Sequence, residues 1–266
     1  MPRIKRSQAE QKHADASGPE FLEALARGLR VVEAFGRDRR WLTLSDVARL
    51  VDLPRASVRR ILATLVALGY AEVDDRLFRL TPRVLALAGA YLSSNAVSDI
   101  VQPALERLSD DIGEACSAAV LDGIEVVMIA HASPNRMLPV SAQVGFRLPA
   151  LSSSLGRVLL AALSDKQVDT LLAGAKLSKL TPATVTDKTE LHRAIKKARA
   201  DGFSLVDQEA EPGFRSISVP LKRRDGRTVA ALNVGVHTER VPLDAMRKVF
   251  LPRLWALAEA LAPQLI

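Results

Sequence analysis

Apolar residues in the first third of the chain recur at helical spacing from residue 21 onward. Intervals of three or four residues separate Leu22, Leu25, Leu29, Val32 and Phe35. This spacing places their side chains on one side of a helix, which is predicted to end near Gly36. A second, shorter helix is predicted at residues 45–51, with Ser45 as its N-cap.

The segment Asp-Leu-Pro at residues 52–54 separates this second helix from a third. Proline disfavours helical geometry in the residue before it and is well tolerated at the start of the next helix. The third helix is therefore predicted at residues 54–68, ending at Gly69. Two short β-type segments follow, at residues 70–73 and 77–80, around a polar turn. Three helices and a hairpin in this order predict a winged helix-turn-helix, a DNA-binding fold.

The third predicted helix has two different faces. At about 100° per residue, one face is predicted to be buried and gathers Val58, Ile61, Leu62 and Leu65. The opposite side carries arginines and small residues, and no acidic residue occurs between positions 53 and 71. An ordinary solvent-exposed face mixes both charges, so we predict that this one recognises DNA. The predicted DNA contacts on the helix are Arg55, Ala56, Ser57, Arg59 and Arg60. Further predicted contacts are Arg27, Thr43, Ser45 and, at the tip of the hairpin, Arg76.

The rest of the chain mixes helices and strands. Residues 83–113 read as helical with one interruption near residues 93–98. Strands are predicted at residues 115–121, 124–131, 204–209, 216–222 and 228–236, and helices at residues 152–163, 165–172, 190–201 and 242–261. Asp-Gly at 122–123 and Arg-Asp-Gly at 224–226 supply turns for two hairpins. Pro252 is predicted to kink or split the last helix. Hairpins with separate helices predict an α+β domain with an antiparallel sheet.

The charge distribution suggests two modules with different partners. The chain has 266 residues and a net charge of +7. Residues 1–83 hold 16 Lys and Arg against 11 Asp and Glu, whereas residues 84–266 hold 21 against 19. A basic module is typical of a protein that meets a polyanion, although basic residues also decorate ordinary solvated faces. We expect a flexible tail at residues 1–18, a DNA-binding domain at 19–82, a linker helix at 83–98 and an effector-binding domain at 99–266.

Several protein classes are disfavoured by the composition. The single cysteine, Cys116, cannot form an internal disulfide, which favours a reducing compartment. Polar residues follow the basic N-terminus where a signal peptide needs an apolar core. No apolar run reaches the roughly 18 residues of a membrane span. We therefore expect a cytoplasmic protein that does not bind a membrane.

Enzyme motifs are missing from the sequence. It contains no phosphate-binding Gly-rich loop, no Gly-x-Ser-x-Gly elbow and no dinucleotide fingerprint. The histidines, His13, His131, His192 and His237, are scattered, and none stands at metal-ligand spacing from another or from Cys116. No catalytic residue, metal or cofactor is predicted. Two alternatives to a regulator stay open: an enzyme for a small organic acid with an N-terminal interaction module, and a constitutive DNA-binding protein whose large domain serves assembly.

Three consecutive serines stand at the start of the helix predicted at residues 152–163. Ser152, Ser153 and Ser154 offer hydroxyls beside free backbone N–H groups and the positive end of the helix dipole, a combination that favours a carboxylate. Arg147 could add a charge pair to the same ligand, or it could be an ordinary solvated side chain. The serines could equally serve only to cap the helix. The residues thus suggest a small carboxylate metabolite as the effector.

Several short fragments match one known family. Leu-Ala-Arg-Gly-Leu at 25–29, Leu-Pro-Arg-Ala-Ser-Val at 53–58 and residues 65–70 look like the DNA-binding half of the IclR family of bacterial transcription regulators. Fragments at residues 145–149, 154–157, 213–217 and 230–234 look like its effector domain. The chain resembles this family over residues 20–262, and within it the branch that controls aromatic-acid catabolism, with regulators of protocatechuate and hydroxybenzoate pathways.

The resemblance implies a GAF-like effector domain, homodimers formed through the DNA-binding halves, and often tetramers. It implies operator DNA and an aromatic acid or its catabolic product as partners, and RNA polymerase as well if the protein is an activator. It places an effector pocket at Ser152, Ser153, Ser154, Leu155, Gly156, Asp207, Glu209, Phe214, Ser216, Asn233 and Gly235. Asp207 and Glu209 would repel an anion and better suit hydroxyls of the ligand. Leu151 stands where many relatives have a histidine, so any contact of that histidine to the effector is lost or replaced.

Overall fold

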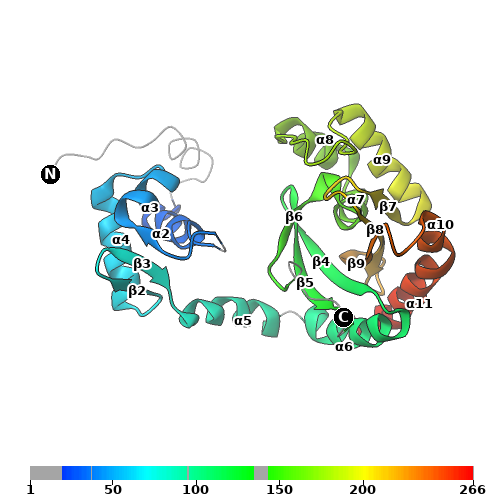
Figure 1. The fold of residues 1–266 in the computed structure, drawn as a ribbon, viewed down its shortest axis with the longest axis horizontal. Coiled ribbons are helices and arrows are strands. Elements are labelled where there is room, and N and C mark those ends of the chain that lie inside the picture. The colour runs from blue at the N-terminus through cyan, green and yellow to red at the C-terminus, as the bar shows by residue number, and fades with distance from the viewer. Residues whose placement is uncertain (1–19, 37, 95, 135–142, 266) are drawn as a thin grey trace. The chain divides into compact units, whose positions relative to one another are not determined.

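The computed structural model describes residues 20–36, 38–94, 96–134 and 143–265. It divides the chain into two compact units, residues 1–91 and 92–266, which are described separately below (Figure 1). The tail predicted at residues 1–18 lies outside the described residues. The predicted α+β class is confirmed, because the second unit combines helices with an antiparallel sheet.

The first unit contains the predicted helices and hairpin. Its elements are α2 (Glu23–Glu33), β1 (Leu42–Thr43), α3 (Leu44–Leu50), α4 (Arg55–Ala67), β2 (Ala71–Asp74) and β3 (Leu77–Leu80). The strands form an antiparallel sheet in the order β1-β3-β2. Strand β1 is two residues long, too short for a periodic pattern to reveal. Val31, Val47, Val58 and Leu62 form the centre of the core that joins the three helices.

The start of α3 differs from the prediction, since Thr43 and not Ser45 is its N-cap. The Thr43 hydroxyl accepts a hydrogen bond from the Asp46 amide at 3.2 Å, and the Asp46 carboxylate accepts one from the Thr43 amide at 3.2 Å. This reciprocal capping box satisfies two helix-end donors. Hydrogen bonds from Thr43 hold the pKa of Asp46 below its ordinary value. Ser45 lies exposed within the first turn.

The connection between the units is helical but broken. A short 3₁₀ turn (Pro82–Val84) leads into α5 (Leu85–Ser94), and α6 (Ala96–Ile112) follows. This break agrees with the interruption predicted near residues 93–98, and the division between the units falls within α5. Among the described residues, no individual helix has the length and apolar character of a membrane span. The helices at residues 82–93 and 97–112 reach that length and apolar character only when they are counted together, and the chain bends sharply between them.

The second unit is built on a six-stranded antiparallel sheet in the order β6-β5-β4-β9-β8-β7. Its strands are β4 (Ala115–Asp122), β5 (Glu125–Ala132), β6 (Arg147–Pro149), β7 (Ser204–Asp207), β8 (Phe214–Lys222) and β9 (Thr228–His237). Five of these strands and both hairpins were predicted. Strand β6 was missed, because Arg-Leu-Pro is too short to show alternation.

Helices cover both faces of this sheet (Figure 1). On one face α6 and α11 (Leu251–Leu261) pack on an apolar core that includes Leu105, Ile217 and Leu254. On the other face lies α7 (Ser154–Ala161), preceded by a 3₁₀ turn (Ala150–Ser152) and packed against α9 (Lys188–Asp201). Helix α8 (Asp165–Gly174) contacts α9.

The C-terminal helix is split, as Pro252 predicts. A short α10 (Leu243–Ala245) passes into a π-helical turn (Met246–Phe250) immediately before α11. Proline lacks an N–H group and clashes with the preceding turn, so the regular hydrogen-bond ladder cannot run through this point.

Candidate DNA interface and ligand cavity

Helix α4 presents a cationic face outward. Val58 and Leu62 anchor its inner side in the core, and the opposite side exposes Arg55, Ala56, Arg59 and Arg60, with Ser57 half-buried. Within the described part of the chain, none of these three arginines forms an ion pair. Their guanidinium groups are therefore available to phosphates or to guanine edges.

The other predicted DNA contacts have different surroundings. Arg27, on α2, forms an ion pair with Glu23 at 2.6 Å. The Thr43 hydroxyl is engaged in the α3 cap, whereas Ser45 is exposed. Arg76 is exposed at the tip of the β2–β3 hairpin, directly after Asp75, whose φ is +51°. The structure thus leaves Arg76 and the α4 arginines as the accessible cationic groups of this set.

A cation–π contact at the same sheet was not predicted from the sequence. The guanidinium of Arg79 lies 4.6 Å from the ring centroid of Trp41 and also forms an ion pair with Glu72. No sequence pattern links these residues, since Trp41 precedes β1 and becomes a neighbour of Arg79 only through the pairing of β1 with β3.

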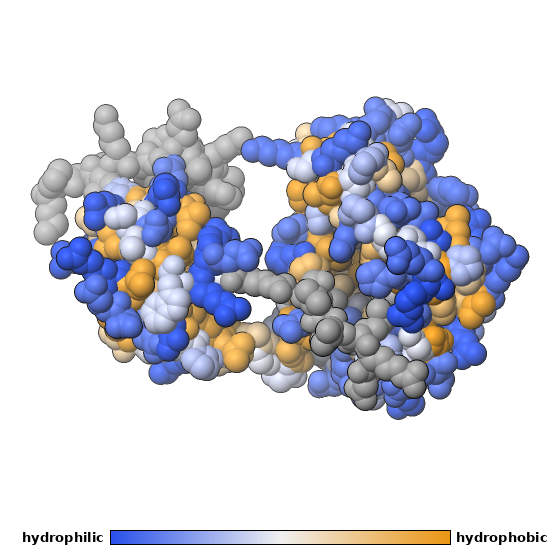
Figure 2. All heavy atoms as spheres, in the orientation of Figure 1, coloured by the Kyte–Doolittle hydropathy of each residue, from blue (hydrophilic) through white to orange (hydrophobic). Residues whose placement is uncertain are grey.

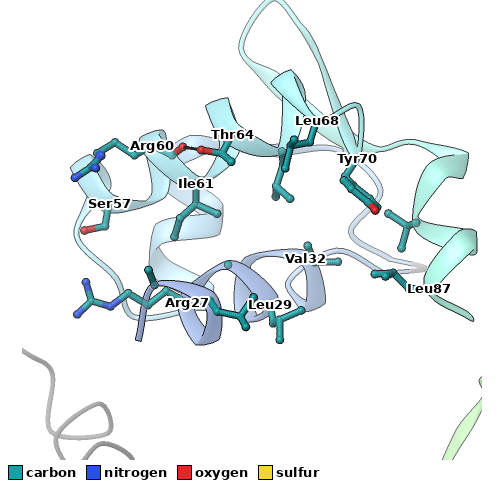
Figure 3. Close-up of a pocket in the computed structure, with 15 residues that line it drawn as sticks. Arg27, Leu29, Val32, Ser57, Arg60, Ile61, Thr64, Leu68, Tyr70 and Leu87 are labelled. Carbon is teal, nitrogen blue, oxygen red and sulfur yellow. Dashed lines mark hydrogen bonds between the residues drawn. The ribbon is translucent and has the colours of Figure 1, made fainter. Parts of the chain in front are cut away.

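An apolar groove of about 590 Å³ runs between α2 and α4 in the first unit (Figure 3). Arg27, Ser57 and Arg60 lie at one end of it, and Tyr70 and Leu87 lie at the other. Its walls include Leu25, Leu29, Val32, Ile61, Leu65 and Leu68. Leu25 and Leu29 are 59% and 49% exposed, so much of the apolar stripe predicted on the first helix faces this groove. Apolar residues are also in view on the surface of the first unit in Figure 2.

The second unit holds a smaller cavity of about 170 Å³ between its sheet and the start of α7. Seven predicted effector contacts line it, namely Ser153, Ser154, Leu155, Phe214, Ser216, Asn233 and Gly235. The remaining lining residues are Ala115, Ser117, Met128, His131, Phe146, Leu148, Ala210 and Glu211. The cavity therefore combines apolar walls with several hydroxyl, amide and imidazole groups and one acidic residue, Glu211.

Strand register places these polar groups in one row across the sheet. Ser218 lies opposite Asn233, Asn233 opposite Ser117, and Ser117 opposite His131. Residues opposite one another in a sheet point to the same face. Four neighbouring strands therefore each contribute a polar residue to one line across this face, and Ser216 on β8 adds a further hydroxyl to the same face. We call the four residues of that line the polar row.

Ser154 joins α7 to the polar row. Its Oγ lies 2.7 Å from Ser216 Oγ and 2.8 Å from Ser218 Oγ, and it accepts a hydrogen bond from Asn233 Nδ2 at 3.1 Å. All four side chains are buried. A buried polar cluster of this kind is stabilising when its members satisfy one another, and this one fixes the start of α7 above β8 and β9.

The first turn of α7 has the features that favour an anion. Ser153 caps the helix by accepting a hydrogen bond from the Gly156 amide at 3.1 Å. Of the three serines, it is therefore the one that has the capping role considered above. The backbone N–H groups at the first helical positions have no partner within a helix, and the positive end of the dipole lies there.

Ser152 and Gly156 do not line the cavity. Gly156 instead packs on the backbone of Ala150, where an added Cβ would lie only 2.1 Å from the carbonyl oxygen.

Three predicted effector contacts lie elsewhere. Asp207 pairs with Arg215 at 3.0 Å, and Glu209 forms a bidentate pair with Arg157 at 2.7 Å for both bonds. Arg147 is exposed and donates to Asp122 and Glu125 on the neighbouring hairpin. None of the three lines the cavity. The expectations that Arg147 pairs with the ligand and that Asp207 and Glu209 bind its hydroxyls are therefore not supported by their positions, because each charge already has a partner.

Phe214 and Gly235 form a matched pair at one side of the cavity. A Cβ on Gly235 would lie 2.5 Å from Cζ of Phe214. The Phe214 ring can therefore pack over β9 only because residue 235 has no side chain. The Phe214 ring also meets His237 edge-on, with centroids 6.2 Å apart.

His131 was assigned no role from the sequence. Its Nδ1 lies 3.0 Å from Ser117 Oγ, and burial lowers its pKa. Ser117 was not singled out at all. The sequence does show a serine and a histidine within two largely apolar strands. Only the register of these strands shows that the two side chains are neighbours.

The structure offers no sign of nucleophilic or metal chemistry among the described residues. Burial raises the pKa of the Cys116 thiol to about 12, so the reactive thiolate is scarce near neutral pH. No group of three or more His, Cys, Asp or Glu side chains in the described ranges could hold a metal ion.

Family models decide the identity of both units. Residues 24–75 match the IclR helix-turn-helix domain, and residues 89–262 match the C-terminal domain of the bacterial transcriptional regulator IclR. The chain belongs to the IclR family. This membership confirms the prediction of a DNA-binding transcription regulator rather than an enzyme.

Relatives within the IclR family support the narrower resemblance. The chain is 42% identical over 265 residues to the Pca regulon regulatory protein of Pseudomonas putida, covering 99% of this chain and 91% of the relative. It is 35% identical over 240 residues to the p-hydroxybenzoate hydroxylase transcriptional activator of Acinetobacter baylyi, covering 88% and 89%. The crystal structure of an IclR homologue from Microbacterium hydrocarbonoxydans complexed with 4-hydroxybenzoate is similar with a TM-score of 0.74 and 28% identity, covering 90% of this chain and 98% of that one.

Proposed function

We propose that this IclR-family regulator binds operator DNA through α4 and takes a small aromatic carboxylate in the cavity beneath α7. The observation that carries the proposal is the cavity itself, where the start of α7 meets the polar row and apolar walls. A regulator of this kind works in the cytoplasm, and RNA polymerase is a partner if the ligand-bound state activates. We further propose domain limits of 19–82 and 99–266, joined by a linker at 83–98.

The lining of the cavity suits an aromatic acid better than a sugar or a nucleotide. Met128, Phe146 and Leu148 provide an apolar surface for a ring, and the start of α7 provides donors for a carboxylate. Among the described residues no arginine or lysine lines the cavity, and Glu211 is its one acidic residue, so the anion would be held by neutral donors and the helix dipole at the start of α7. The volume is below the roughly 300–1,000 Å³ of pockets for drug-sized ligands, which favours a single ring. A related structure with bound 4-hydroxybenzoate agrees with this class.

The experiment that tests the proposal measures DNA binding with and without ligand. A labelled duplex from the region upstream of the gene is titrated with the full-length protein, and fluorescence anisotropy gives the Kd. We expect specific binding, and a change in Kd or in the mobility of the complex when 4-hydroxybenzoate is added, because a ligand shifts the balance between two conformations only if it binds them differently. Consumption of the acid with no DNA complex would instead favour the enzyme alternative.

We also propose that the groove between α2 and α4 binds the same groove of a second chain. Large exposed apolar patches mark interaction sites, and a two-fold dimer presents two recognition helices to a palindromic operator. Leu25 and Leu29 supply exposed apolar surface on α2.

Substitution of both leucines tests this dimer. Leu25→Glu with Leu29→Glu is expected to halve the molar mass of the particle, because two carboxylates cannot be buried without partners. Light scattering after size-exclusion chromatography measures the mass against the 28.8 kDa of one chain. Leu180→Glu is the matched control, since Leu180 is also exposed but lies in the second unit. A double variant with the mass of the wild type would place the dimer interface elsewhere.

A further inference from the structure

The polar row ends on β5 at His131, whose imidazole lines the cavity. Ser117 occupies Nδ1 of this ring at 3.0 Å. Among the described residues no hydrogen bond reaches Nε2, which leaves that nitrogen for a molecule in the cavity. The Ser117 hydroxyl can donate or accept, so Nε2 can in turn accept or donate a hydrogen bond.

The backbone of His131 is held in place from α6. Gln102 Nε2 donates to the His131 carbonyl at 2.9 Å, and its Oε1 accepts from the His131 amide at 3.0 Å. Strand β6 pairs only with residues 125–127 of β5, so it does not reach this part of the strand edge. Among the described residues, the Gln102 amide supplies the hydrogen-bond partners of this part of the edge. His131 is therefore fixed by a bond at its ring and by two at its main chain.

The two ends of the cavity differ in electrostatic character. Burial lowers the pKa of His131, so the ring is neutral near pH 7 and brings no positive charge. The positive potential lies at the start of α7, beside Ser154 and Asn233. Positions 233 and 131 are two strands apart, and thus about 10 Å apart across the sheet. An anion is favoured at the first end, and an uncharged group that can donate or accept is favoured at the second.

We propose that His131, held by Ser117, recognises a ring hydroxyl of the aromatic acid and thereby selects hydroxylated benzoates over benzoate itself. A benzene ring with a carboxylate and a hydroxyl at opposite ends can span the two ends of the cavity. Benzoate keeps the carboxylate but leaves Nε2 without a partner, and an unsatisfied buried polar group is costly. This assignment rests on the proposed function and names the residue that sets its specificity.

Titration calorimetry of the full-length protein with 4-hydroxybenzoate and with benzoate tests the assignment. The wild type is expected to bind 4-hydroxybenzoate about 10-fold more tightly. His131→Phe is expected to bring this ratio near one, because phenylalanine fills the same space without a nitrogen that 4-hydroxybenzoate could bind or that benzoate would leave unsatisfied. His192→Phe is the control, since His192 lies on α9 beside Asp169 and not in the cavity, and it should keep the wild-type ratio.

Each outcome bears on a different part of the proposal. A wild-type ratio retained by His131→Phe would overturn the role of His131. If that variant does not fold, Ser117→Ala provides the test. Loss of the hydrogen bond to Nδ1 should lower the ratio of the two affinities, and an unchanged ratio would overturn the assignment. A wild type that binds both acids equally would overturn this inference and leave the proposed function standing. A wild type that binds neither acid would overturn both.

Discussion

Arg157→Ala is expected to lower the free energy of unfolding of the second unit by about 3–5 kcal/mol, because it leaves the Glu209 carboxylate buried without its cation. Both side chains are nearly inaccessible, at 7% and 10% exposure. The guanidinium makes two bonds of 2.7 Å to Glu209 and a third, of 3.0 Å, to the Leu151 carbonyl. One substitution therefore removes a bidentate pair and a link between α7 and the preceding turn.

The two tryptophans make this unit measurable by itself, because Trp41 lies in the first unit and Trp255 in the second. In a Trp41→Phe background, urea unfolding followed by fluorescence reports the surroundings of Trp255 only. Arg147→Ala is the matched control, since Arg147 also makes two hydrogen bonds to carboxylate oxygens, on Asp122 and Glu125, but is exposed. Exposed ion pairs contribute about 1 kcal/mol or less. Equal losses for Arg157→Ala and Arg147→Ala would contradict the assigned role of the buried pair.

A double-mutant cycle separates the pair from its surroundings. In Arg157→Met with Glu209→Leu both charges are gone, so the double variant should be less destabilised than the sum of the single variants. Some loss should remain, because Glu209 also accepts a hydrogen bond from the Val185 amide at 3.1 Å. An additive result would show that the two charges act independently.

The same ion pair bears on ligand binding through the loop that follows β7. Glu209 stands next to Ala210 and Glu211, which line the cavity. Thr184 Oγ1 holds this loop as well, by donating to the Glu209 carbonyl at 2.7 Å. Arg157→Ala is therefore expected to weaken ligand binding in the absence of urea as well, where the second unit is still folded.

Much of the fold could be predicted because its signals are local. The β-type segments that became β4, β5, β8 and β9, together with the glycine turns at residues 122–123 and 224–226, specify two hairpins. Helical spacing and Pro54 specify the helix-turn-helix. The elements that were not predicted, or were predicted with the wrong cap, also have local causes. Strands β1 and β6 are too short to show a period, and the choice between Thr43 and Ser45 as N-cap depends on which of them Asp46 can bond in return.

The ligand cavity could be predicted only in part, because most of its contacts are long-range. The serines at the start of α7 are visible as a helix start, and the resemblance to a family supplied Asn233 and Phe214. The polar row requires the pairing of four strands, which no single segment reveals. The same limit explains Asp207 and Glu209. Whether a carboxylate faces a ligand or an arginine depends on residues 8 and 52 positions away in the chain.

Arg59→Ala with Arg60→Ala is expected to weaken operator binding about 30-fold or more. Both side chains are exposed on the outward face of α4, and neither forms an ion pair within the described residues. A contact to a base edge contributes about 1–3 kcal/mol, and two such losses at the lower limit already amount to about 30-fold. If the two arginines instead contact phosphates, the variant should bind all sequences more weakly, and the slope of log K against log salt should fall by about 2.

Anisotropy titrations at several salt concentrations, with the operator duplex and with an unrelated duplex of equal length, distinguish these two modes. Loss of affinity for the operator alone indicates base readout, and an equal loss for both duplexes indicates phosphate contacts. Lys196→Ala with Lys197→Ala is the control, because it removes the same two positive charges from α9 of the second unit. If the α4 variant and this control bind the operator with the same Kd and the same salt slope, the outward face of α4 is not the DNA-binding surface.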